Sequence, residues 1–266
     1  MRRIEDIRNT IIEGDSSLIL KEFPRESIDL VVTSPPYDNL RDYTGESPWS
    51  FDCFQRIARQ LYRVMKPGGV VVWVVGDAID NGGKTLTSYR QALFFQSIGF
   101  KMFDVIIYEK AGSGPPHPNR YFNSFEYMFV LSKGLPKTIN ILKDKPNKWA
   151  NHSTYSEVTR REKDGSLTKK GKKVVNEFGV RTNIWRYANG RGFATQDEIA
   201  YQHPAIFPEK LVEDHIKAWS NEGDLVLDPF GGSGTVAKIA NQQNRDWVLV
   251  EVSPEYCEIA RQRLDL

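Results

Sequence analysis

The stretch VLDPFGGSGTVA, from Val226 to Ala237, combines the three features that decide the fold class. Apolar residues up to Asp228 predict a buried strand, glycines follow, and apolar spacing after Thr235 predicts a helix. Missing β-carbons let a ligand approach the backbone, and a helix N-terminus favours an anionic group. The glycine spacing matches a dinucleotide-binding fingerprint, which is weak evidence when taken alone.

A second carboxylate, after that of Asp228, lies at the end of the next predicted strand. Glu251 ends the predicted strand 246–252, and a carboxylate there can accept both hydroxyls of a ribose. Only 15 residues follow Glu251, so the remaining strands must come from the N-terminal half. The strand IDLVVT (28–33) is predicted beside the glycine strand. Its tip, residues 34–37, would then face the crevice outside the carboxyl ends of the strands, where ligands bind in open α/β sheets.

The rest of the chain alternates between strand and helix patterns. Further strands are predicted at 10–14, 70–77, 101–110 and 124–133, and helices at 16–23, 48–65, 86–100, 208–220 and 253–264. The first helix is expected to be capped near Asp15 or Ser16. This alternation predicts an α/β fold with a doubly wound, mostly parallel Rossmann-like sheet.

Composition is that of a globular protein, with 40% hydrophobic and 26% charged residues among 266. No apolar run reaches the roughly 18 residues of a membrane span, and no signal peptide precedes the first strand. Two cysteines exclude a disulfide framework, and four distant histidines show no ligand spacing. We therefore expect a cytoplasmic protein with neither a metal nor a membrane partner.

Charge is distributed unevenly along the chain. Residues 133–191 contain 15 Lys/Arg and 5 Asp/Glu, a net of +10, which leaves −8 for the remainder of a chain of net +2. Periodicity also fades there, and 134–200 reads as a basic insertion with little core of its own. Such segregation indicates an anionic partner. A solvated lysine-rich loop is the alternative.

The tip Ser34-Pro35-Pro36-Tyr37 is unusual because two prolines cannot continue a central strand. An ordinary strand terminator and turn would explain it. However, TSPPY (33–37) resembles the catalytic motif of amino-methylating DNA methyltransferases, and DPFGGSGT (228–235) resembles their S-adenosylmethionine loop. The catalytic motif comes first and a basic segment separates the two, as in the β-class. The resemblance covers the chain outside 134–200.

The resemblance implies a circularly permuted motif order, S-adenosylmethionine as cofactor and double-stranded DNA as partner. It also implies a base that leaves the helix. Ser34, Pro35, Pro36 and Tyr37 would be catalytic. Hydrogen-bond acceptors at Ser34 and Pro35 would localise the lone pair of an amino nitrogen, the prolines would fix them, and Tyr37 would stack on the base.

Cofactor-binding residues also follow from the resemblance. Asp15 would contact the adenine amino group and Glu251 the ribose, while the turn would surround the methionine end with Asp228, Phe230, Gly231, Gly232, Ser233, Gly234 and Thr235. His203 and Phe207 resemble the segment beside the methionine carboxylate, although Phe207 stands where many members have lysine. A helix cap at Asp15 and a surface strand end at Glu251 are the structural alternatives.

The DNA-binding residues are predicted in two regions. Residues 108–130 resemble the base-pocket region, where Arg120 has either a phosphate-binding or a structural role. In the basic segment, phosphate contacts are expected from Lys169, Lys170, Lys172 and Lys173, and base reading from Arg181 and Arg186. The predicted organisation is a catalytic half (1–133), a target-recognition insertion (134–200) and a cofactor-binding half (201–266).

Ser34 favours cytosine N4 as the methylated atom, since most adenine N6 enzymes of this type have an acidic residue at that position. Adenine N6 is the alternative, and a nicotinamide-dependent oxidoreductase is the alternative from another class. A companion restriction endonuclease of a restriction-modification system and a homodimer are both compatible with the resemblance. The sequence decides neither, and the recognition sequence cannot be derived from it.

Overall fold

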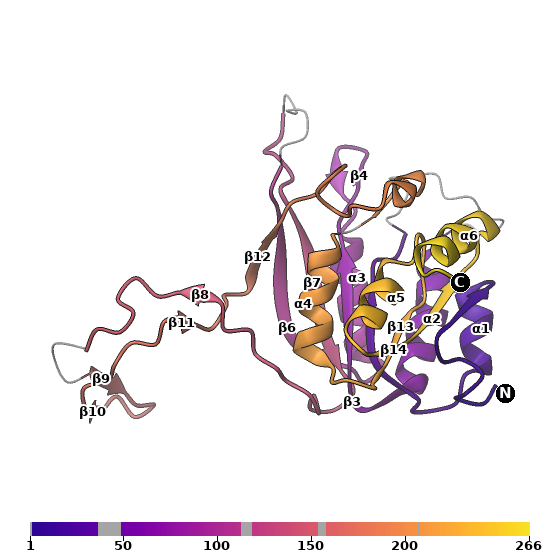
Figure 1. Cartoon of the computed structure of the whole chain (residues 1–266). Coiled ribbons are helices and arrows are strands. Elements are labelled where there is room, and N and C mark those ends of the chain that lie inside the picture. The colour runs from indigo at the N-terminus through magenta and orange to yellow at the C-terminus, as the bar shows by residue number, and fades with distance from the viewer. Residues whose placement is uncertain (1, 37–48, 113–118, 154–157, 207) are drawn as a thin grey trace. The chain divides into compact units, whose positions relative to one another are not determined.

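The computed structural model describes residues 2–36, 49–112, 119–153, 158–206 and 208–266. The chain forms two compact units, one of residues 1–140 with 183–266 and a smaller one of residues 141–182. The first unit contains the sheet and its helices (Figure 1). The smaller unit is shorter than the predicted insertion 134–200, because residues 134–140 and 183–200 belong to the first unit.

An eight-stranded sheet is the centre of the first unit. Seven of its described strands are parallel to one another, and β7 runs antiparallel to both of its neighbours. The glycine strand β13 lies between β14 and β2, as predicted. In spatial order the strands are β1 (Thr10–Glu13), β14 (Asp246–Glu251), β13 (Leu225–Asp228), β2 (Ile28–Thr33), β3 (Met65–Val75), β7 (Phe125–Ser132), β6 (Lys101–Lys110) and β12 (Ile184–Tyr187).

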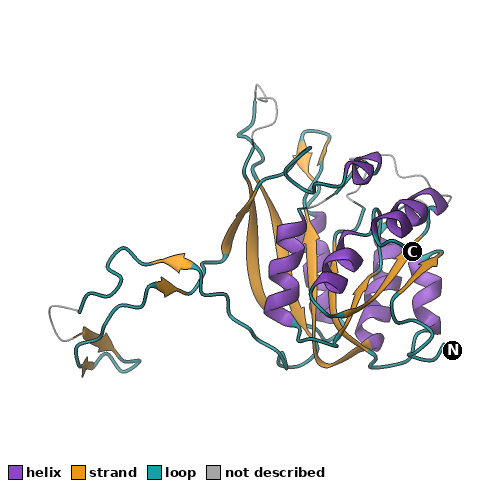
Figure 2. Cartoon of the chain, viewed as in Figure 1, coloured by secondary structure: helices purple, strands orange, loops and turns teal. Residues whose placement is uncertain are grey.

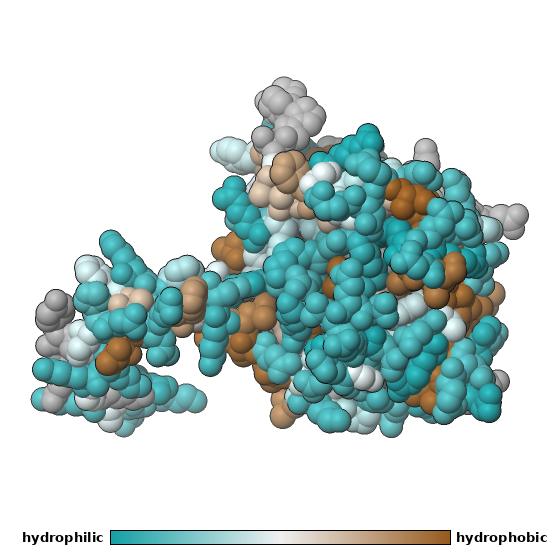
Figure 3. Space-filling view, in the orientation of Figure 1, coloured by the Kyte–Doolittle hydropathy of each residue, from teal (hydrophilic) through white to brown (hydrophobic). Residues whose placement is uncertain are grey.

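Helices cover both faces of this sheet (Figure 2). One face carries α1 (Ser16–Glu22), α2 (Phe51–Val64) and α3 (Thr87–Ser97), and the other carries α4 (Glu209–Trp219), α5 (Thr235–Gln242) and α6 (Pro254–Arg263). The fold is therefore the predicted doubly wound α/β sheet. The face of this unit seen in Figure 3 is mostly hydrophilic, as expected when helices cover the apolar strands.

The first face is packed around aromatic side chains. Phe54 of α2, Phe95 of α3 and Trp73 of β3 are fully buried, with ring centroids 5.1–5.7 Å apart. The Trp73 indole N–H donates to Gln91 at 2.7 Å, so this buried donor is satisfied. Phe54→Ala would remove about 3–5 kcal/mol of stability. The ring centroids of Phe230 and Trp73 are 6.0 Å apart, so the core continues up to the glycine turn.

The edge strand β12 was not predicted. Its four residues alternate between exposed and buried, with Trp185 and Tyr187 buried, and it pairs in parallel with β6. A run of four residues is too short for a periodicity signal, and its polar neighbours concealed it. The strand belongs to the first unit, although its residues lie within the predicted insertion 134–200.

Short connecting elements complete the first unit. The hairpin of β4 (Ile79–Asp80) and β5 (Gly83–Lys84) follows β3, and the 3-10 helix η2 (Glu198–Gln202) precedes α4. None of the described helices of the chain is long and apolar enough to cross a membrane.

The second unit consists of two small antiparallel pairs, β8 (Lys145–Pro146) with β11 (Phe178–Gly179) and β9 (Val158–Arg161) with β10 (Leu167–Lys170). No side chain that the structure describes in this unit is buried. Its sequence has 11 Lys/Arg and 5 Asp/Glu, a net of +6. The unit thus has hardly any hydrophobic core and a strong positive charge.

Candidate active site

The carboxyl ends of four neighbouring strands meet at one edge of the sheet. Asp15 follows β1, Glu251 ends β14, Asp228 ends β13 and Thr33 ends β2. Glu13 pairs with Glu251, so β1 and β14 finish at the same level. In open α/β sheets, ligands bind outside such strand ends.

A buried hydrogen bond joins the two motifs that the sequence singled out. The Thr33 hydroxyl donates to Asp228 Oδ1 at 2.6 Å, and the Phe230 N–H donates to the same oxygen at 3.0 Å. Thr33 is fully buried and Asp228 is 2% exposed. Burial raises the pKa of the Asp228 carboxyl to about 7, although both hydrogen bonds act in the opposite direction. Thr33, which immediately precedes Ser34, was not singled out from the sequence as a site residue.

The glycine turn is tightly packed. A β-carbon on Gly231 would lie only 2.1–2.6 Å from side-chain atoms of Leu249, so no larger residue fits there. Gly234 has φ +79° at the start of α5, a conformation that L-residues rarely adopt. The Gly231 N–H donates to the Val250 carbonyl at 2.9 Å and the Gly234 N–H to the Gly231 carbonyl at 2.8 Å.

Glu251 lies beside this turn and is 8% exposed. Its two oxygens accept backbone N–H groups, from Gly232 at 2.7 Å and from Ser253 at 2.9 Å. Burial raises the pKa of Glu251, and these backbone donors act to lower it. Glu251 is therefore a buried carboxylate at the predicted edge, and it is not a surface strand end.

Asp15 and His203 come from opposite halves of the chain. Asp15 is the N-cap of α1 and accepts the Ser17 N–H at 2.7 Å. This helix cap is the structural role that the sequence offered for Asp15 as the alternative to cofactor binding. A β-carbon on Gly232 would lie 2.9 Å from His203 Nε2, so this imidazole lies on the turn. The His203 ring also contacts Tyr256 of α6 at 4.4 Å, edge to face.

Two further turn residues are held by an arginine that sequence reasoning missed. Arg263 Nη1 donates to the Ser233 carbonyl at 2.7 Å, to the Ser233 hydroxyl at 3.1 Å and to the Thr235 hydroxyl at 3.0 Å. Tyr256, Ala260 and Arg263 are buried on one side of α6 at helical spacing. A cation within such an apolar stripe was the signal that could have identified it.

The proline-containing tip is partly described. Pro35 is buried, while Ser34 and Pro36 are half-buried at the end of β2. Phe230 packs edge to face on Trp49, with centroids 5.3 Å apart. Tyr37 and Phe207 lie outside the described residues.

The predicted DNA-binding residues are dispersed. In the first unit, half-buried Arg120 donates to the Gly82 carbonyl, and Arg186 is exposed on the edge strand β12. In the second unit, Arg181 is bound to Asp144, with its Nε 3.0 Å from both carboxylate oxygens. The side chain of Lys170 is outside the described part, and the exposed lysines of this cluster are Lys169, Lys172 and Lys173.

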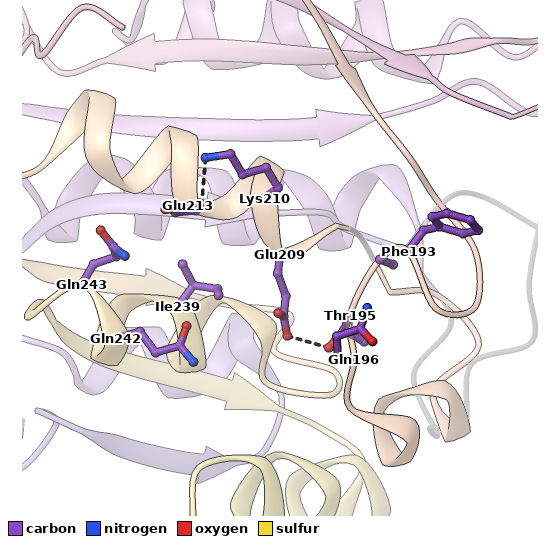
Figure 4. A pocket seen from close by; sticks show the side chains of 10 residues that line it. Phe193, Thr195, Gln196, Glu209, Lys210, Glu213, Ile239, Gln242 and Gln243 are labelled. Atoms are coloured by element: carbon purple, nitrogen blue, oxygen red, sulfur yellow. Dashed lines mark hydrogen bonds and ion pairs between the residues drawn. The ribbon is translucent and has the colours of Figure 1, made fainter. Parts of the chain in front are cut away.

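A pocket of about 380 Å³ lies between residues 193–196 and helices α4 and α5. Its charged side chains are paired: Glu209 accepts from Thr195, and Lys210 donates to Glu213 (Figure 4). In the part of the chain that the structure describes, no group of three or more His, Cys, Asp or Glu side chains is arranged to hold a metal ion.

The sheet, the glycine turn and the two buried carboxylates define a Rossmann-like α/β protein whose candidate ligand site lies at the carboxyl ends of the strands. The model of the DNA methylase family N6_N4_Mtase matches residues 28–262, and the chain belongs to this family. The enzyme is therefore a DNA methyltransferase of the N6/N4 type. The family match leaves the nicotinamide-dependent oxidoreductase without support.

Three similar proteins illustrate the relationship. The orphan methyltransferase M.BamHII of Bacillus amyloliquefaciens is 55% identical over 239 residues, which are 90% of this chain and 89% of the relative. The structure of the cytosine-N4-specific PvuII DNA methyltransferase has the same fold, with a TM-score of 0.70 at 23% identity over 96% of this chain and 85% of that chain. The structure of a DNA modification methylase of Thermus thermophilus in complex with S-adenosyl-L-methionine has a TM-score of 0.60 at 25% identity, and the match covers 95% of this chain and 93% of that chain. Since the first relative is an orphan, a companion endonuclease is not supported.

The residues at the sheet edge fit this cofactor. The space beside Gly231 is filled by the Leu249 side chain, so the missing β-carbon lets the turn pack closely against β14. Glu251 keeps acceptor capacity beyond its two backbone donors, because each carboxylate oxygen has two lone pairs. Two buried carboxylates with raised pKa values also suit a ligand that carries hydroxyl donors and a positive charge.

Proposed function

We propose that this enzyme transfers the methyl group to the exocyclic N4 of cytosine in double-stranded DNA. The observation that carries the proposal is the hydrogen bond between Thr33 and Asp228, which joins the TSPPY and DPFGGSGT segments at 2.6 Å. Ser34 follows Thr33 directly, and Phe230 follows Asp228 after one residue. An acceptor for the base and a turn for the cofactor would therefore lie next to each other.

In this proposal the protein prepares the amino nitrogen. S-adenosylmethionine supplies a methyl group activated by a positively charged sulfur. The lone pair of an exocyclic amino group is conjugated with the ring, so it is a poor nucleophile. Ser34 Oγ and the Pro35 carbonyl accept its N–H groups and localise the lone pair, and the fixed φ of Pro35 and Pro36 keeps these acceptors in place. The nitrogen would form its bond to the methyl carbon as the bond between that carbon and sulfur breaks, which leaves a neutral thioether, and the methylated nitrogen would release one proton.

Cofactor contacts are assigned by the same reasoning. Glu251 would hold the ribose hydroxyls, and the turn from Phe230 to Thr235, which Asp228 orients, would surround the methionine end. Asp15 would reach the adenine amino group with the oxygen that does not cap α1, and His203 would lie near the methionine carboxylate. Tyr37 and Phe207 keep the roles that the resemblance implies.

The second unit is proposed as the target-recognition part. Its net charge of +6 and its lack of buried described side chains suit an adaptable contact with the phosphate backbone. Phosphate binding is assigned to Lys169, Lys170, Lys172 and Lys173. Arg181 would read a base only after leaving Asp144, so Arg186, exposed on β12, is the stronger candidate.

Cytosine N4 is favoured over adenine N6 by Ser34. A neutral acceptor at the first position of the motif is typical of N4 enzymes, and an acidic residue is typical of most N6 enzymes. The assignment is tested by incubating the protein with duplex DNA of mixed sequence and labelled S-adenosylmethionine. Mass spectrometry of the digested nucleosides should then find N4-methylcytosine.

Two further outcomes are informative. N6-methyladenine would overturn the choice of base, and the absence of any methylated base from protein that binds the cofactor would overturn the function. Ser34→Ala should greatly reduce methylation. The matched control is Ser97→Ala, at an exposed serine at the end of α3, which should leave methylation unchanged.

A further inference from the structure

Arg263 is a fully buried cation directly behind the glycine turn. Its side chain has no exposed surface, and burial of an unpaired guanidinium would be strongly unfavourable. One side of the guanidinium is bound to the turn, at the Ser233 carbonyl and at the hydroxyls of Ser233 and Thr235. These contacts join the C-terminal helix to the loop expected to receive the cofactor.

The other side of the guanidinium is held by two carboxylates. Arg263 Nε lies 2.9 Å from Asp197 Oδ2, and Nη2 lies 2.8 Å from Glu209 Oε1. Lys238 Nζ contacts the same two oxygens at 2.6 and 2.8 Å. Two cations thus balance two carboxylates. Burial acts to raise the pKa of Asp197, but the bonds from Lys238 and Arg263 outweigh it, and the pKa is lowered.

The contacts from Arg263 add side-chain restraints to a turn whose own hydrogen bonds are made by the backbone N–H groups of Gly231, Gly232 and Gly234. Glycines at three of its positions leave the backbone with high conformational freedom when it is not held. Gly234 at the start of α5 also offers no capping side chain. A planar guanidinium held from behind presents its donors in one fixed orientation. Figure 4 shows Glu209, one of the two carboxylates that hold Arg263, with its hydrogen bond from Thr195.

We propose that Arg263 is a positioning residue for S-adenosylmethionine binding. It acts through Ser233 and Thr235 and does not contact the cofactor itself. Asp197 and Glu209 orient the guanidinium, so the turn is preorganised before the ligand arrives. Preorganisation lowers the entropic cost of binding, and its loss appears as weaker binding of the cofactor.

The test compares Arg263→Gln and Arg263→Lys with wild type by calorimetric titration of S-adenosylmethionine and by steady-state kinetics. R263Q should weaken cofactor binding by about tenfold or more, the equivalent of about 1.4 kcal/mol. The KM for the cofactor should rise in parallel, while kcat at saturating cofactor stays within about threefold. R263K should recover part of the affinity, because one ammonium can serve either the turn or the carboxylates.

Arg261→Gln is the matched control. Arg261 lies on the same helix, is 39% exposed and pairs at 3.4 Å with Glu258, so R261Q should leave both constants unchanged. A folded R263Q enzyme whose cofactor affinity equals that of wild type would overturn the proposal, even if its Tm were lower. Should R263Q not fold, Asp197→Asn decides: it retains the arginine but loosens it, and unchanged cofactor affinity in D197N would equally overturn the proposal.

Discussion

Thr33→Val isolates the hydrogen bond that joins the two motifs. Valine has nearly the shape of threonine, so the variant removes the hydroxyl and leaves little cavity. The lost bond runs to Asp228 Oδ1 at 2.6 Å, and both side chains are buried. Water therefore cannot easily replace the missing donor, and the carboxylate keeps the Phe230 N–H at 3.0 Å.

The magnitude of the effect depends on the charge of Asp228. A hydrogen bond to a charged group contributes about 1.5–3 kcal/mol and one between neutral groups about 0.5–1.5 kcal/mol. Because the pKa of Asp228 is about 7, the carboxyl is mostly ionised at pH 8 and mostly protonated at pH 6. T33V should therefore lower the free energy of unfolding by about 1.5–3 kcal/mol at pH 8 and by about half as much at pH 6.

The sign of the pH dependence follows from the raised pKa. The folded state holds the proton of Asp228 more tightly than the unfolded chain, so its contribution to stability is complete below the ordinary pKa of 3.8 and is lost as the pH rises through about 7. The Thr33 hydroxyl opposes this rise in pKa. In T33V the pKa should move further up, so the loss of stability should extend to higher pH.

Urea unfolding at pH 6 and pH 8 measures both effects, and Thr33→Ser is the control because it retains the hydroxyl. T33S should lose only the contribution of one methyl group, and this loss should be equal at the two pH values. Comparison of each variant with wild type at the same pH cancels other titrating groups. An equal loss in T33V at pH 6 and pH 8 would refute a role for the Asp228 charge. No loss at all would refute the hydrogen bond.

Three further predictions concern the reaction, the cofactor and the DNA. Ser34→Ala should reduce the single-turnover rate of methylation by about a hundredfold, the effect typical of one lost preorganised electrostatic contact, with DNA affinity nearly unchanged in filter binding. Glu251→Gln should weaken S-adenosylmethionine binding in calorimetry, because an amide is a weaker acceptor for hydroxyl donors than a carboxylate. Since burial raises the pKa of Glu251, the affinity of wild type should fall on acidification, at a higher pH than an ordinary glutamate would cause. In titrations of DNA at several salt concentrations, the slope of log affinity against log salt should be on the order of −4 to −6, because each neutralised phosphate contributes about −0.9. The slope should become less steep when neutral residues replace Lys169, Lys170, Lys172 and Lys173. An unchanged slope would identify this cluster as a solvated loop.

The centre of the fold could be predicted because its signals are long. The strand predicted at 70–77 has an unbroken apolar run at 70–75, and helix α2 shows its period over 14 residues. The neighbourhood of β13 and β2 followed from a simple count, since too few residues remain after Glu251 to complete the sheet. The structure confirms this neighbourhood through the pairing of Val226 with Leu30.

The contacts that the sequence did not reveal are those made between distant side chains. Arg181 was predicted to read bases, but its bond with Asp144, 37 residues away, can be seen only in three dimensions. Asp15 was correctly expected near a helix start, and its cap on Ser17 does not test its cofactor role. Arg263 was missed because a single arginine in an amphipathic helix normally faces water.

The two bonded systems around the glycine turn explain why motifs about 200 residues apart can act together. Thr33 holds Asp228 at the start of the turn, and Arg263 holds Ser233 and Thr235 at its end. Between these fixed points the turn has only Pro229, Phe230 and glycines, and Phe230 is itself packed on Trp73 of the core. The turn is therefore restrained at both ends and along its aromatic side, and its residues 231–235 are buried. Because one of these restraints comes from the strand that carries Ser34, a change that displaces β2 should disturb the base acceptor and the cofactor turn together. A change confined to the second unit should spare both.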